Sequence, residues 1–142
     1  MTTIVDIAKA VKDELNGGTF SQTFTAERHY QPVFELKDMK TLHVTVVPKD
    51  VEMQLATRNS SQHDCRVDVA IQKKLEVADL AEIDELMGLV EEIAAFLCRR
   101  KLASVPNALW IKTANEPIYA TEHMEQFRQF TSILTLTYRV LV

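Results

Sequence analysis

The stretch His63-Asp64-Cys65-Arg66-Val67-Asp68-Val69-Ala70-Ile71-Gln72-Lys73 decides the fold class of this chain. Its apolar and charged side chains alternate with a period of two, which is the spacing of a β-strand. One side of the strand is therefore apolar and the other is polar. A strand of this kind belongs in an antiparallel or mixed sheet that is covered on one face only. The apolar series is Cys65, Val67, Val69 and Ile71, and the charged series is Asp64, Arg66 and Asp68.

Four other segments show strand character on either side of this stretch. Alternating side chains predict strands over residues 21–31 and 41–48, which end at Pro32 and Pro48. Two more strands are expected later in the chain, a short one over 107–112 and a long one over 128–142. The last of these is strand-like to its end, so we expect the C-terminus to be tied into the sheet.

Two helices complete the prediction. Residues 3–16 carry apolar side chains at helical spacing, and Asn16-Gly17-Gly18 follows as a stop, since glycine accepts the left-handed conformation that ends helices. Residues 79–100 form the longer helix, with acidic side chains in its first turns and basic ones at its end. The chain is thus expected to be a single α+β domain over 1–142. Its sheet is one layer of about five strands, mixed or mostly antiparallel, with the N-terminal helix and the long helix packed on it.

The segment between the second and third strands, residues 49–62, is expected to be a long loop. Long loops without secondary structure in a compact domain are usually functional. Val51, Met53 and Leu55 alternate within it, and Arg58 follows them. We therefore predict that Val51, Met53, Leu55 and Arg58 form an interface with another subunit or partner, where the loop becomes a strand.

Composition excludes several function classes. The chain has 142 residues, of which 46% are hydrophobic and 25% charged, as in ordinary globular domains. A net charge of −4 argues against general nucleic-acid binding, and the three glycines cannot form a dinucleotide-binding or Walker loop. Two cysteines are too few for a disulfide framework. The chain has neither a membrane-spanning run nor a signal peptide, so we expect an intracellular product without a membrane partner.

Candidate catalytic and metal-binding residues are few. His63-Asp64-Cys65 has metal-ligand residue types, but neighbours on a strand face opposite ways, so only His63 and Cys65 could share a face. Zinc sites need three or four ligands, and no further ligand motif accompanies this one. Glu122 and His123 could supply a general base, but no nucleophile with a distinctive sequence frame goes with them. We therefore predict no enzyme activity, no metal site and no cofactor.

The order of segments resembles a known family. A strand ending in Arg28-His29-Tyr30-Gln31-Pro32 is followed by Leu42-His43-Val44-Thr45-Val46-Val47-Pro48, and then by a loop ending in Thr57-Arg58. The strand from Asp64 to Lys74 comes next, then a helix with Ile83-Asp84-Glu85-Leu86, and Phe130 to Arg139 closes the pattern. Over nearly the full chain this layout resembles the small neck and tail-completion proteins of tailed bacteriophages, especially tail terminators.

The resemblance implies a structural role in the virion tail or neck, with assembly in the host cytoplasm. Proteins of this family form rings, commonly hexamers, that cap the tail tube and join it to the head connector. It implies as partners further copies of the chain, the tail tube protein and the head–tail connector proteins, while genome DNA passes through the pore without specific binding. The family has no catalytic motif to carry over to residues of this chain.

Three alternative functions stay open. Within the same structural class, the chain could be a head–tail adaptor or stopper protein of the neck. A small metal-dependent hydrolase using His63, Cys65 and either Glu122 or His123 is a more remote alternative. A monomeric adaptor module is the third. Bound metal, or a mass that does not depend on concentration, would distinguish the last two from a ring protein.

Overall fold

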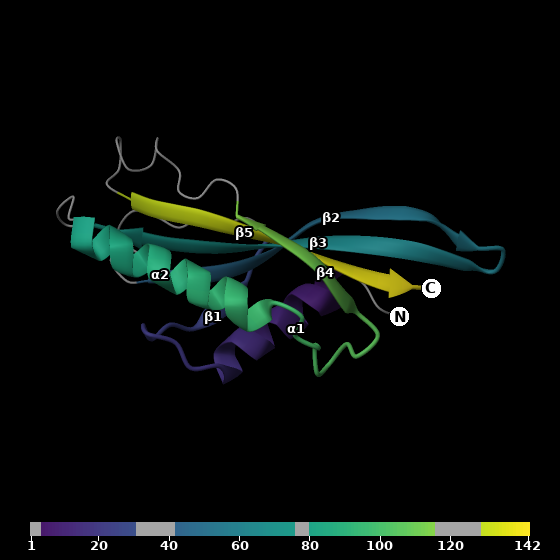
Figure 1. The fold of residues 1–142 in the computed structure, drawn as a ribbon, viewed down its shortest axis with the longest axis horizontal. Coiled ribbons are helices and arrows are strands. Elements are labelled where there is room, and N and C mark those ends of the chain that lie inside the picture. Colours follow the sequence, from purple (N-terminus) through teal and green to yellow (C-terminus); the bar gives the residue numbers. More distant parts are fainter. Residues whose placement is uncertain (1–3, 31–41, 76–79, 116–128) are drawn as a thin grey trace.

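The fold is an α+β arrangement of two helices on a five-stranded mixed sheet, seen in a computed structural model that describes residues 4–30, 42–75, 80–115 and 129–142 (Figure 1). The helices are α1 (Ile4–Gly17) and α2 (Leu80–Leu97). The strands are β1 (Ala26–Arg28), β2 (His43–Thr57), β3 (Ser60–Lys74), β4 (Leu109–Asn115) and β5 (Gln129–Leu141). Element order and fold class match the prediction from the sequence.

The sheet has the order β1-β2-β3-β5-β4. The β1–β2 pair is parallel, and the β2–β3, β3–β5 and β4–β5 pairs are antiparallel. β3 is the central strand, because it pairs with β2 on one side and with β5 on the other along almost its whole length. The stretch that shows the clearest alternation in the sequence is therefore the middle of the sheet.

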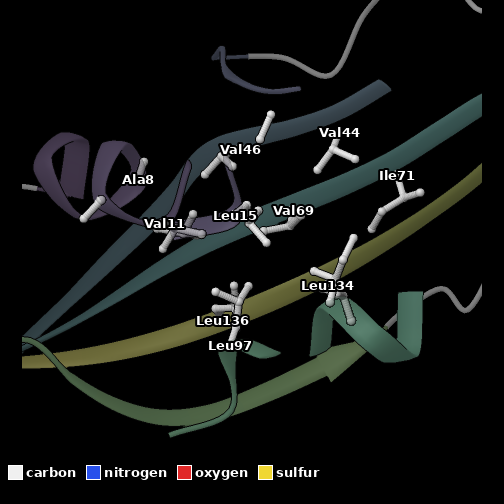
Figure 2. Packing of buried hydrophobic residues seen from close by; sticks show 14 of the residues in the cluster. Ala8, Val11, Leu15, Val44, Val46, Val69, Ile71, Leu97, Leu134 and Leu136 are labelled. Atoms are coloured by element: carbon white, nitrogen blue, oxygen red, sulfur yellow. The ribbon is translucent and has the colours of Figure 1, made fainter. Parts of the chain in front are cut away.

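Both helices cover the same face of the sheet, which we call the helix face. Figure 2 shows Leu15 of α1 beside Val69, and Leu97 of α2 beside Leu136. The central strand contributes Cys65, Val67, Val69 and Ile71 to this core, as its alternation predicts. Burying apolar area contributes roughly 25 cal/mol per Å², so this cluster is the main source of stability.

The opposite face, which we call the back face, carries the charged series of β3. Asp64, Arg66 and Asp68 all lie there, and each bonds a side chain of a neighbouring strand. Asp68 accepts a hydrogen bond of 2.7 Å from the Thr135 hydroxyl. The two-sided nature of the central strand is thus confirmed.

The structure corrects three local predictions. Residues 49–62 are not a loop, because β2 and β3 pair through this segment to the turn at Arg58 and Asn59. The strand expected over 21–31 is limited, in the described residues, to Ala26–Arg28. The first helix ends at Gly17 without any glycine at positive φ. Gly18 instead permits a close approach, since a Cβ there would lie 2.9 Å from the rings of Phe20 and Phe96.

Pro48 is the reason that β2 is longer than the sequence predicts. The Val46 carbonyl accepts a hydrogen bond from the His29 amide, so the backbone of Val46 points toward β1. Two residues later, the nitrogen of Pro48 points to the same side, away from β3. β1 has ended there, so the missing N–H of proline costs no ladder hydrogen bond. A register shift at Lys49 follows, and the pairing with β3 then resumes.

Candidate assembly interface

The predicted interface residues lie on a projecting β-hairpin. β2 and β3 extend beyond both helices and form the element at the right of Figure 1, which we call the arm (residues 49–62). Thr57 pairs with Ser60 across the turn, and their hydroxyl oxygens are 2.7 Å apart. The arm is therefore an ordered strand pair within one subunit, not a strand that forms only against a partner.

Three of the four predicted residues form a line along the helix face of the arm. The register places Val51, Met53 and Leu55 opposite Cys65, His63 and Ser61, which lie on the helix face of β3. Val51 is half-buried against the core, whereas Met53 is 66% exposed and Leu55 is 79% exposed. Arg58 is exposed at the tip. The arm thus presents a strip of apolar side chains that becomes more exposed with distance from the helices.

The back face of the arm is braced by ion pairs. Arg66 binds Asp50 through two hydrogen bonds of 2.5 Å, and Arg139 binds Asp64 at 2.9 and 3.3 Å. Arg139 holds the pKa of the Asp64 carboxyl below its ordinary value. These pairs link β2 to β3 and β3 to β5, because Asp50 lies on β2 and Arg139 on β5.

The C-terminus braces the arm further. The amide of Ser61 donates to the Val142 carbonyl and the amide of Val142 donates to the Ser61 carbonyl, both at 2.8 Å. The expectation that the C-terminus is tied into the sheet is therefore confirmed. Because β5 follows β3 this far, only the last few residues of the arm form a two-stranded hairpin.

Among the described strands, none covers the outer edge of β2 along the arm. β1 pairs only with Val44, Thr45 and Val46, so in the described parts of the chain no strand borders β2 from Val47 onward. The opposite edge of the sheet is β4, which no other described strand pairs on its outer side. Open edges of this length can template pairing with another chain.

Sequence reasoning missed the surface near β4. Leu109 is 63% exposed at the start of this strand. A cavity of about 530 Å³ lies between α2 and β4, with Trp110 on one side and Ala94, Ala95 and Cys98 on the other. Trp110 is half-buried, and its indole N–H donates to the Thr113 hydroxyl at 2.9 Å. The presence of Trp110 was the only signal in the sequence for this site.

The candidate metal residues are not gathered into a site. Cys65 is buried on the helix face beside half-buried His63, while Asp64 points to the back face and binds Arg139. Burial raises the pKa of the Cys65 thiol, which makes it a poor nucleophile. Among the described residues, no three His, Cys, Asp or Glu side chains form a group that could hold a metal ion. Glu122 and His123 lie outside the described residues.

The acidic side chains of α2 do not form an acid–base pair either. Asp84, Glu85 and Glu91 are exposed. Glu92 instead accepts hydrogen bonds from the amide and hydroxyl of Ser21, which connects α2 to the segment after α1. These carboxylates therefore belong to the solvated side of an amphipathic helix.

No family model matches the sequence, and a search of the curated proteins finds no match. Neither described helix combines the length and hydropathy needed to cross a membrane.

Proposed function

We propose that this chain is a structural protein of the tailed-phage virion, a tail terminator or tail-completion protein that forms a ring. The ring caps the tail tube and joins it to the head connector. The role is non-catalytic and needs no cofactor.

The arm is the observation that carries this proposal. It places Met53 and Leu55 in solvent on a strand that no other described strand borders on its outer edge. A monomer gains nothing from an exposed apolar strip beside an open edge, which is a liability for aggregation. An assembly that covers both would explain why the chain carries them.

A contact between the two unlike edges of the sheet would build a ring and not a two-fold dimer. In the described residues the two edges of the sheet differ, one formed by β1 and the arm and the other by β4. A contact between unlike surfaces repeats by rotation, and it generates a closed ring when that rotation closes. The layout of the whole chain, which resembles tail terminators, supports the same reading.

The proposal is tested by mass and by tube capping. Light scattering over a concentration series, with negative-stain images of the same samples, should show closed rings near six times 16.2 kDa. Added to its polymerising tail tube protein, the chain should bind tube ends and stop their growth. Binding to portal complexes in place of tube ends would identify an adaptor or stopper. A chain that stays monomeric and binds neither would contradict the proposal.

A further inference from the structure

The β2 and β4 edges that no other described strand pairs lie at similar positions along the strand axis. The inference drawn from them rests on the ring proposed above. We propose that the arm edge of β2 in one subunit pairs antiparallel with the outer edge of β4 in the next copy of this chain. The sheet then continues from subunit to subunit around the ring.

Strand direction is the first argument. β2 is antiparallel to β3, β3 to β5, and β5 to β4, so β4 runs opposite to β2 within one subunit. Rotation about an axis along the strands keeps each strand's direction. The β2 strand of one copy therefore meets the β4 strand of the next in antiparallel orientation, the arrangement that every neighbouring pair except β1–β2 already has.

The positions of the two edges along the strand axis, which we call their heights, are the second argument. Following the register across the sheet, Leu109 lies level with Arg139, Asp64 and Glu52. At the other end of β4, Ala114 lies level with Thr135, Asp68 and Val47. β4 ends one residue later at Asn115, which lies level with Val46, so β4 spans the heights from Val46 to Glu52. Of these positions, β1 pairs only with Val46. Two copies can pair at these edges without a shift along the strands.

The faces and charges also match. A rotation about this axis keeps the helix faces of all subunits on one side, so Val51 of one copy lies beside Trp110 of the next. Met53 and Leu55 then lie beyond it, toward a cavity of about 330 Å³. Ala108, Leu109 and Trp110 line this cavity together with the basic residues 99–101 that follow α2. On the back face, the exposed carboxylate of Glu52 approaches the exposed ammonium of Lys112. Opposite charges across neighbouring strands stabilise their pairing.

Directed disulfide formation tests this contact. The variant Glu52→Cys/Leu109→Cys is made in a Cys98→Ser background, because Cys98 is exposed and Cys65 is buried. Within one subunit β3 and β5 separate the two positions, which places them about 14 Å apart at three strand spacings. A disulfide needs Cα atoms within about 7 Å, so any bond between them joins two chains.

We expect a ladder of covalent oligomers on a non-reducing gel, ending at the size of the closed ring. A second pair, Glu52→Cys/Lys112→Cys, forms a disulfide if the register between the two strands is shifted by two residues. The matched control is Met53→Cys/Leu109→Cys, whose side chains point to opposite faces and should not cross-link. A variant that carries only one of the two new cysteines can form no covalent species larger than a dimer.

The outcomes separate this contact from the proposed function. Dimers formed by Glu52→Cys alone would show that the arm pairs with itself and would overturn the contact. Rings seen by light scattering without a disulfide in either pair would also overturn it, while leaving the ring itself intact. A ladder that continues into open fibres, with no capping of tubes, would support the contact and contradict the terminator function. A protein that stays monomeric at every concentration and does not cross-link overturns the contact.

Discussion

Tyr138 places a hydroxyl group inside the core, where no described residue forms a hydrogen bond with it. Its ring is fully buried on the helix face of β5, and its oxygen has no partner in the described part of the chain. Burial raises the pKa of this phenol well above its ordinary value of 10.0, so it stays neutral. The side chain therefore stabilises the fold through the apolar area that its ring buries. The unpaired hydroxyl lowers that stabilisation.

We predict that Tyr138→Phe keeps or raises the free energy of unfolding, by up to about 1 kcal/mol, because it removes an unsatisfied buried group. Tyr138→Ala should lower that free energy by about 3–5 kcal/mol through the cavity it leaves. Urea denaturation of the three proteins measures both effects. A clear loss of stability in Tyr138→Phe would show that the hydroxyl has a favourable contact.

Glu14 joins α1 to the chain that follows α2. Its carboxylate accepts a hydrogen bond of 3.0 Å from the Ala103 amide and one of 2.9 Å from Arg100. The Ala103 amide, and then Arg100, hold the pKa of Glu14 below its ordinary value of 4.5. A depressed pKa in the folded state means that this contact stabilises the protein above pH 4.5, and that the stabilisation is lost as the pH falls through the folded pKa.

Glu14→Gln should therefore lower the free energy of unfolding at pH 7 by about 1–2 kcal/mol. The difference between this variant and the unchanged protein should shrink below pH 4.5, where Glu14 becomes protonated. Asp13→Asn is the matched control, because Asp13 is exposed beside Lys12. A difference that stays constant from pH 7 to pH 3 would contradict the assigned role of the charge.

At the scale of elements, the short edge strand β1 is held from both sides. β2 pairs with it on one side through the register Ala26↔Val44 to Arg28↔Val46. On the other side, the side-chain amide of Asn16 donates to the Ala26 carbonyl at 3.1 Å, and its oxygen accepts from the Ala26 amide at 2.7 Å. Asn16 thus occupies the place of a neighbouring strand and connects the end of α1 to the sheet.

Asn16→Asp should loosen β1, because it keeps the shape of the side chain but places an acceptor against the Ala26 carbonyl. We expect a loss of about 1–3 kcal/mol and faster hydrogen exchange at the Ala26 amide, with the exchange of central β3 amides changed less. Asn16→Ala removes both hydrogen bonds without adding repulsion. Its free energy of unfolding should therefore lie between those of the unchanged protein and Asn16→Asp. Unchanged exchange at Ala26 in Asn16→Asp would contradict this role.

At the scale of the whole molecule, stability and assembly depend on different residues. The core lies under α1 and α2, whereas Met53 and Leu55 project beyond it and are mostly exposed. Removing the segment from Val51 to Leu55 would leave its partners on β3 unpaired. Substitutions that keep the backbone are therefore the better test of the arm.

The double variant Met53→Ser/Leu55→Ser should abolish rings while changing the free energy of unfolding by less than about 0.5 kcal/mol, as at ordinary surface positions. Gln54→Ser/Arg58→Ser is the control on the same arm. Light scattering and urea denaturation of both variants separate assembly from folding. Rings of normal mass in the first variant would exclude Met53 and Leu55 from the interface.

The sequence by itself determined the α+β class, the order of elements, and the apolar and polar faces of the central strand. These depend on local periodicity, and the 2-residue and 3.6-residue repeats of Val67, Val69 and α2 are readable without any partner. The same alternation identified Val51, Met53 and Leu55 as unusual. Their ordered pairing with β3 was missed, because Pro48 looks like a strand end unless the open side of β2 is known.

Only the tertiary structure decided which strand edges lack a described neighbour, and where along the strand axis they do so. The strand order β1-β2-β3-β5-β4 brings together segments that are far apart in the sequence. No local pattern in the sequence encodes the residue of β2 at which pairing with β1 ends. The cavity beside Trp110 depends likewise on where α2 crosses the sheet. An interface is a property of surfaces that the fold assembles, so the residues that mark the arm are visible in the sequence, whereas the surface proposed to receive it is not.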